Sequence, residues 1–111
     1  MKNEQVVYNQ QVALTELGGG VSRKILAYND QMMMVEVHFE KGGIGSTHTH
    51  PHLQMTYVLS GRFLFTIEDH EFEVAAGDTL QFPSSAAHGT VCLEAGVLLD
   101  VFNPMREDFV Q

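Results

Sequence analysis

The amino-acid sequence predicts an all-β domain, a sandwich or barrel built from about eight short strands. Apolar and polar residues alternate in short runs, which places the apolar side chains of each run on one face of a strand. Gly, Asp and Pro, which are common in turns, separate these runs at roughly the spacing expected for the strands of a sandwich or barrel. Helical periodicity is hard to find, so helix is expected only in short pieces.

Residues 32–39 show the alternation most clearly. The two faces of this run carry Met33, Val35, Val37 and Phe39 on one side, and Met32, Met34, Glu36 and His38 on the other. A wholly apolar face opposite a mixed one is typical of a half-buried strand.

Residues 55–68 and 70–75 continue the pattern around two breaks. These breaks are Ser60-Gly61 and Glu68-Asp69-His70, and each is short enough to close an antiparallel hairpin. Gly77-Asp78 then marks a further turn. Two hairpins followed by a turn are therefore expected in this part of the chain.

The last predicted strand ends at Asn103-Pro104 and has two different faces. Val97, Leu99 and Val101 share one face, and Leu98, Asp100 and Phe102 share the other. The pattern does not decide which face points inward. If Asp100 does, burial raises its pKa toward the range useful for proton transfer, and it becomes a candidate general acid or base. Otherwise it is a surface carboxylate.

Length and charge limit the possible functions. A chain of 111 residues is expected to form one domain, with a peripheral N-terminal segment (residues 1–20) ending in three glycines, a barrel (21–103) and a C-terminal tail (104–111). The formal charge of −8, with six Lys and Arg residues, argues against nucleic-acid binding. No apolar run is long enough for a membrane span, and one cysteine suits a reducing compartment, so a cytoplasmic location is expected.

Three histidines, His48, His50 and His52, stand at alternate positions. Such spacing puts side chains on one strand face with Cα atoms about 6.5 to 7 Å apart. Two imidazoles can then share a metal ion, each at about 2.1 Å. Gln54 has the same parity and can add a neutral oxygen ligand, and His88, after a proline-serine turn, is the candidate for a fourth ligand. The alternative is that the first three histidines are exposed loop residues.

Two linked segments resemble the motifs of the cupin family. From Gly42 to Gly61 the sequence reads G-x5-H-x-H-x3-Q-x6-G, which resembles the first cupin motif at every spacing. From Gly77 it reads GDTLQFPSSAAH, which is similar to the second motif in the placement of its glycine, proline and histidine. The resemblance implies a single small β-barrel of the double-stranded β-helix, or jelly-roll, type. It also implies one divalent metal ion bound by the matching residues His48, His50, Gln54 and His88.

Three positions depart from these motifs. Gln54 stands where Glu is more common, which makes the site less negative and its metal preference less secure. Ser85 replaces a turn glycine, which is tolerable if this residue avoids a positive φ. Cys92 stands where Asn is common and is expected to be a small buried hydrophobe rather than a ligand. His52 is expected beside the ligands or at the rim.

A closer resemblance covers residues 17–109. The stretches 17–28, 35–41, 98–102 and 106–109 are similar to the small cupins of pectin and alginate breakdown, the pectin degradation proteins that linearise 4,5-unsaturated monouronates. This resemblance implies a small anionic sugar substrate and conversion of the cyclic uronate to an open-chain 5-keto-4-deoxyuronate. It implies Asp100, Phe102 and Arg106 as catalytic residues.

The chemistry of this reaction is consistent with those residue types. The enol ether of the substrate is protonated at C4 and hydrated at C5 before the ring opens, and Asp100 would supply the proton. Arg106 would hold the carboxylate and Phe102 would pack against the sugar. The metal would act as a Lewis acid without redox change.

Two other functions are compatible with the same residues. Three histidines and one oxygen ligand also suit Fe(II) or Mn(II) in a dioxygenase, which oxygen uptake would reveal. A non-catalytic cupin that binds a sugar or small acid is the second alternative. Ni, Zn, Mn, Fe and Co all accept imidazole and amide oxygen, so the metal is not identified. The family resemblance also implies a homodimer.

Overall fold

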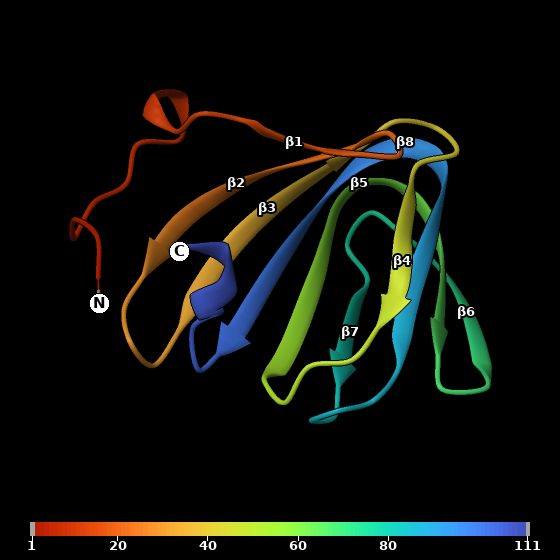
Figure 1. Cartoon of the computed structure of the whole chain (residues 1–111). Coiled ribbons are helices and arrows are strands. Elements are labelled where there is room, and N and C mark those ends of the chain that lie inside the picture. The colour runs from red at the N-terminus through yellow and green to blue at the C-terminus, as the bar shows by residue number, and fades with distance from the viewer. Residues whose placement is uncertain (1, 111) are drawn as a thin grey trace.

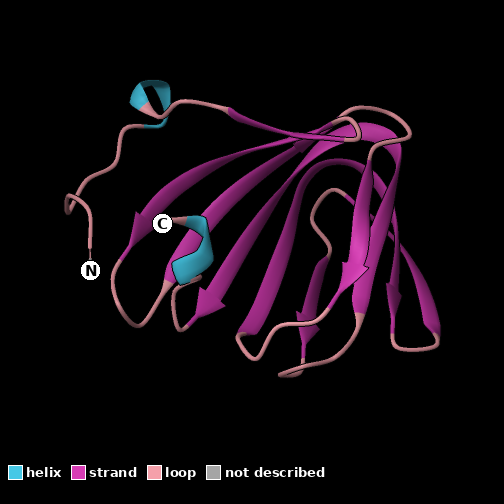
Figure 2. Ribbon diagram, in the orientation of Figure 1, coloured by secondary structure: helices cyan, strands magenta, loops and turns pink. Residues whose placement is uncertain are grey.

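The computed structural model describes residues 2–110, which form one antiparallel sheet of eight strands (Figures 1 and 2). The strands are β1 (Thr15–Gly18), β2 (Val21–Tyr28), β3 (Met33–Phe39), β4 (Ile44–His48), β5 (Leu53–Ile67), β6 (His70–Ala75), β7 (Thr79–Phe82) and β8 (His88–Asn103). Helix within the described residues is confined to two single turns, η1 (Asn9–Gln11) and η2 (Glu107–Phe109). The all-β prediction is confirmed.

The two longest strands, β5 and β8, organise the sheet. The main strand order is β1-β2-β3-β8-β5-β6, while β4 pairs with β8 and β7 pairs with β5. The first half of β5 faces the second half of β8, and Thr56 lies opposite Asp100; further along, Ile67 lies opposite His88. Both strands bend, so the sheet folds over on itself without closing into a complete barrel (Figure 1).

The bend of β5 lies at Ser60-Gly61, where a hairpin was expected. That expectation is wrong, because β5 continues through these residues, with irregular pairing to β8. Gly61 has a φ of 84°, and a Cβ placed on Gly96 of β8 would lie 2.6 Å from the Gly61 Cα. The two glycines let the bent strands approach more closely than larger residues would allow.

The other predicted turns lie where the sequence placed them. Ile67 pairs with His70 across the Glu68-Asp69 hairpin, and Gly77-Asp78 separates β6 from β7. Ser85 does not avoid a positive φ, however, since its φ is 63°. A serine therefore holds the left-handed conformation that glycine would adopt without strain.

Two apolar clusters fill the space inside the folded sheet. The larger contains Val21, Phe39, Val58, Phe63, Phe65, Phe82, Cys92 and Leu98. Cys92 is 1% exposed, which confirms the prediction of a small buried hydrophobe. The second cluster, Met33, Val35, Phe102 and Met105, also contacts Phe109 and Val110 and so attaches the C-terminal tail to the sheet.

These clusters decide the orientation of the last strand. Leu98 and Phe102 are each 3% exposed, so the face that carries Asp100 is the inner one. The predicted buried face of residues 32–39 is confirmed as well, because Met33, Val35 and Phe39 are buried.

The N-terminal residues run along the edge of the sheet. The Asn3 side chain donates to the Leu26 carbonyl and accepts from the Tyr28 amide, and β1 pairs with β2. The division of the chain at residues 20 and 103 stays a prediction. Among residues 2–110 no helix is long and apolar enough to cross a membrane.

Candidate metal centre

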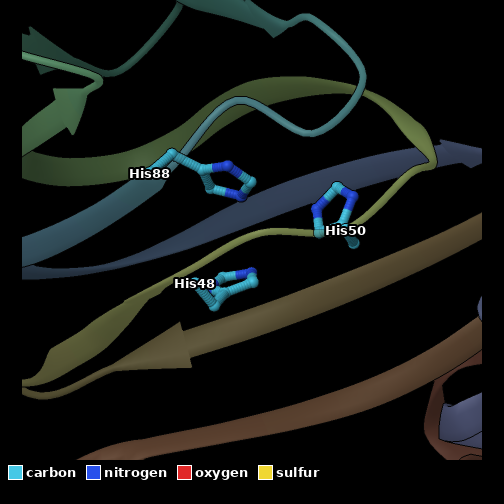
Figure 3. Close-up of side chains that lie close together, drawn as sticks. All are labelled: His48, His50 and His88. Atoms are coloured by element: carbon cyan, nitrogen blue, oxygen red, sulfur yellow. The ribbon is translucent and has the colours of Figure 1, made fainter.

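Three histidines from two distant stretches of sequence converge inside the folded sheet (Figure 3). His48 ends β4, His50 lies in the connection to β5, and His88 begins β8. His48 and His88 are paired residues of the β4–β8 ladder, which fixes one relative to the other. One ring nitrogen from each histidine lies within 4.8 Å of the others. The cluster is therefore compatible with a metal site.

A backbone carbonyl orients each imidazole in the same way. The Nδ1 atoms of His48, His50 and His88 lie 2.8, 3.1 and 3.0 Å from the carbonyl oxygens of Ser46, His52 and Ala86, respectively. A carbonyl only accepts, so each Nδ1 carries the proton and donates it. The Nε2 atom of each neutral ring then keeps its lone pair for a metal ion.

Gln54 adds an oxygen to this cluster. Its Oε1 atom lies 2.9 Å from His50 Nε2, and its Nε2 atom donates to Thr56 Oγ1 at 3.0 Å. The single Thr56 hydroxyl proton is donated to Asp100, so the Gln54 amide must be the donor to Thr56 and its oxygen must face His50.

Two acceptors therefore face one another, the lone pair of His50 Nε2 and the oxygen of Gln54. Burial lowers the pKa of His50, which disfavours placing a second proton on the ring. A divalent cation bound by both atoms removes the repulsion. The donors of His48, His50, Gln54 and His88 thus fit a divalent metal.

The protonation state of the cluster also suits a metal. Burial lowers the pKa of His88 to about 4, with further lowering by the nearby His48 and His50. Because this pKa is well below 7, the ring is neutral at neutral pH, which is the form that metal binding requires.

The turn that leads to His88 is tied to the loop that carries His50. The Ser85 amide donates to the His50 carbonyl at 2.8 Å, and the Ser84 hydroxyl donates to the Pro51 carbonyl at 2.6 Å. Ser85, with its strained conformation, thus belongs to the contact between the turn that precedes His88 and the loop that carries His50. His52 lies beside the cluster as expected, and its carbonyl is the acceptor for His50.

A cavity of about 400 Å³ opens on the cluster. Six of the seven predicted site residues line it: His48, Gln54, His88, Asp100, Phe102 and Arg106. The seventh, His50, packs against this wall, with its ring 4.9 Å from the His88 ring and 5.6 Å from the Phe102 ring. The structure brings all seven residues together, and their roles stay predictions.

Asp100 lies on the cavity wall with its carboxyl group hydrogen-bonded to Thr56 at 2.7 Å. Burial raises its pKa to about 6, although the bonds from Thr56 and Gln54 and the charges of His48 and Arg106 act in the opposite direction. This carboxyl group can hold a proton close to neutral pH.

Arg106 is buried beside the cavity, and its guanidinium is already engaged. It donates from Nε and Nη2 to the two carboxylate oxygens of Asp108, at 3.1 and 2.9 Å. Its guanidinium carbon also lies 5.2 Å from the Phe102 ring centroid and 4.3 Å from that of Phe109. Arg106 is therefore a cation held in place by a carboxylate and two rings.

Three further residues belong to the same site and were not predicted from the sequence: Arg23, Thr56 and Phe109. Thr56 shares the strand parity of Gln54, and Arg23 shares that of Val21 and interrupts an apolar face. These parities were available signals. Phe109 offered none, because it reaches the cavity from a single helical turn beyond the sheet.

The bent sheet and its histidine cluster define the cupin class of small β-proteins. A family model described as a cupin domain matches residues 35–102, and the chain belongs to the cupin family. It is 45% identical over 97 residues to pectin degradation protein KdgF from Dickeya dadantii (strain 3937), across 86% of this chain and 88% of the relative.

Two solved structures are similar over nearly the whole chain. KdgF from Halomonas sp. is 31% identical with a TM-score of 0.91, covering 96% of this chain and 99% of its own. An RmlC-like cupin from Shewanella frigidimarina is 36% identical with a TM-score of 0.94, covering 97% of both chains. The expected resemblance to the pectin degradation cupins is confirmed.

Proposed function

We propose that this protein is a metal-dependent enzyme of pectin or alginate breakdown that converts 4,5-unsaturated monouronates to open-chain 5-keto-4-deoxyuronates. The observation that carries the proposal is the line of contacts from His50 through Gln54 and Thr56 to Asp100, in which Gln54 and Asp100 line the cavity. It links a carboxyl group that can hold a proton to a cluster that can hold a metal. The similarity to pectin degradation protein KdgF of Dickeya dadantii supports a role in pectin degradation.

Asp100 is proposed as the residue that delivers a proton to C4 of the substrate. Its Oδ1 atom accepts from Thr56, which leaves Oδ2 to carry the transferable proton. Water adds its hydroxyl to C5, the C5–ring oxygen bond breaks to give the ketone, and the hydrate left at C1 loses one water. One water enters and one leaves, so the net change is an isomerisation. The carboxylate of Asp100 regains a proton during the sequence.

The metal would be held by His48, His50, Gln54 and His88, and when bound it supplies Lewis-acid stabilisation of developing negative charge. Arg106 is proposed to bind the uronate carboxylate with the guanidinium donors that Asp108 leaves free. Phe102, whose ring lies 5.6 Å from the His50 ring and 5.2 Å from the Arg106 guanidinium carbon, is proposed to pack against the apolar face of the sugar.

The test is direct. Protein loaded with Ni, Zn, Mn, Fe or Co in turn is incubated with 4,5-unsaturated galacturonate while the absorbance of the C4=C5 bond is followed. We expect loss of absorbance, and a fall of at least about 100-fold in kcat for Asp100→Ala. Arg106→Ala should mainly raise KM. Asp69→Asn, in the exposed β5–β6 hairpin, is the matched control.

The result also separates the alternatives. Near wild-type turnover by both Asp100→Ala and Arg106→Ala would rule out the proposed roles. Oxygen uptake in place of absorbance loss would indicate a dioxygenase. Tight binding across a panel of uronates without turnover would indicate a binding protein.

We further propose that the protein is a homodimer. The outer face of β3, β8 and β5 carries exposed apolar side chains, Met34, Leu53, Met55, Tyr57 and Leu59, each at least 37% exposed. Met34 and Met55 flank Val101 in one row across the three strands, so the patch is continuous. Sedimentation equilibrium should show a dimer that Met55→Glu converts to a monomer, while Lys41→Glu leaves it unchanged.

A further inference from the structure

Arg23 is a cavity-lining cation that no step of the proposed reaction uses. It lies on β2 opposite Val37 of β3, and Val21, Arg23 and Val37 all line the cavity. The neighbouring Lys24 points to the opposite face, where its ammonium bonds to Asn9. Arg23 is thus the charged residue of the inner face of β2.

Arg23 and Arg106 meet at one aromatic ring. Their guanidinium carbons lie 3.7 and 4.3 Å, respectively, from the ring centroid of Phe109. These distances place the two carbons no more than 8.0 Å apart. Two like charges this close repel, and the cation–π contacts with Phe109 offset part of the repulsion.

The two arginines differ in their partners. Arg106 is bonded to Asp108 through two donors. Within residues 2–110 the Arg23 side chain forms no hydrogen bond and no ion pair with another side chain. Burial and the charge of Arg106 both lower the pKa of Arg23, and the charge of Asp108, which is hydrogen-bonded to Arg106, offsets only part of this lowering. Since no side chain among residues 2–110 accepts from the guanidinium of Arg23, its donors can bond to a ligand in the cavity that it lines.

We infer that Arg23 is a second carboxylate-binding residue of the site. Arg23 and Arg106 together would present two guanidinium groups to the carboxylate of the substrate. The inference rests on the proposed function for the choice of substrate. An anionic sugar approaches a chain of net charge −8, so the attraction must come from a local pair of cations. In this role Arg23 binds the substrate directly, while proton transfer stays with Asp100.

The first experiment measures kcat and KM of the metal-loaded full chain with 4,5-unsaturated galacturonate. Arg23→Gln is expected to raise KM by about tenfold or more, the size of a lost charge-assisted hydrogen bond, with kcat changed less than about threefold. Arg23→Lys keeps the charge and should give an intermediate KM. Lys24→Gln, on the outer face of the same strand, should match the wild type. An unchanged KM in Arg23→Gln would overturn the inference.

The second experiment does not depend on turnover. Calorimetry compares the affinities for D-galacturonate and D-galactose, which differ in the carboxylate, and the wild type should prefer galacturonate by at least about tenfold. Arg23→Gln should reduce this ratio toward one. Loosened packing around Phe109 would instead weaken the binding of both sugars and leave the ratio unchanged. The same ratio in wild type and variant would overturn the inference. If wild-type protein fails to consume the unsaturated sugar, the proposed reaction fails, and this ratio still decides the role of Arg23.

Discussion

Thr56 and Asp100 stand directly opposite each other on β5 and β8, and the Thr56 hydroxyl donates a 2.7 Å hydrogen bond to Asp100 Oδ1. Gln54 in turn donates to the Thr56 oxygen at 3.0 Å. Cross-strand pairing thus places a neutral donor between a predicted metal ligand and a predicted acid. A change at Thr56 alters the carboxyl group without removing any predicted ligand.

Thr56→Val is expected to shift the pH dependence of turnover. The Thr56 bond lowers the pKa of Asp100, so its loss raises that pKa above about 6. If protonated Asp100 is the acid, activity falls as pH rises through this pKa, and the basic limb of the kcat profile should move to higher pH. Thr79→Val, at an exposed position of β7, should leave the limb in place. A limb unmoved by Thr56→Val would count against Asp100 as the acid.

His48→Ala tests the metal cluster at its most exposed ligand, where the fold depends least on the side chain. Removing one of three imidazoles is expected to weaken binding of a divalent metal by at least about tenfold. Competition with a chromophoric chelator measures the affinity. His70→Ala, at the exposed start of β6, should bind metal as the wild type does. Equal affinities in the two variants would show that the cluster is not the binding site.

The sequence was most informative where side chains recur at fixed spacing. The spacing of His48, His50 and Gln54, with the motif resemblance that added His88, predicted a cluster that the structure brings together. Alternation could not decide the face of Asp100, however, because the outer face of β8 carries Val97, Leu99 and Val101 and is as apolar as the inner one. The burial of Leu98 and Phe102 settled the question, and it depends on tertiary packing.

Two features that the sequence did not predict involve contacts between distant parts of the chain. Ser60-Gly61 has the composition of a hairpin turn, yet β5 continues because Gly96 of β8 leaves room for the bend. Arg23 belongs to the site because the C-terminal tail folds back and places Phe109 against it. Local patterns do not specify such contacts.

His88 is expected to make the metal-free protein less stable as pH falls from about 6.5 to about 4, while Asp100, whose pKa is raised to about 6, acts in the opposite direction over much of the same range. The pKa of His88 is about 4 in the folded chain, below the ordinary value of 6.5, because burial disfavours the charged ring. Between these values the unfolded chain binds the proton that the folded chain does not, so acid favours unfolding. Urea denaturation of chelator-treated wild type and His88→Asn at pH 7.5 and 5 isolates the His88 contribution, because Asp100 is present in both proteins: acidification should cost the wild type more stability than the variant. An equal pH dependence in both proteins would contradict this assignment.

Gly96→Ala tests the bend on which the whole site depends. An added Cβ would lie 2.6 Å from the Gly61 Cα, a backbone atom that cannot move aside without separating β5 from β8. We expect a loss of about 2 kcal/mol or more in the free energy of unfolding, the upper part of the range for overpacking.

Gly77→Ala is the matched control: no atom lies within 4 Å of its added Cβ, and its φ of 93° leaves only local strain of about 1 to 2 kcal/mol. If Gly96→Ala were no more destabilising than this control, close approach of the two strands would not be what holds the bend, because the added methyl would have been accommodated. Since β5 carries Gln54 and Thr56 and β8 carries His88 and Asp100, a destabilised bend should also weaken metal binding, which the chelator competition measures on the same protein.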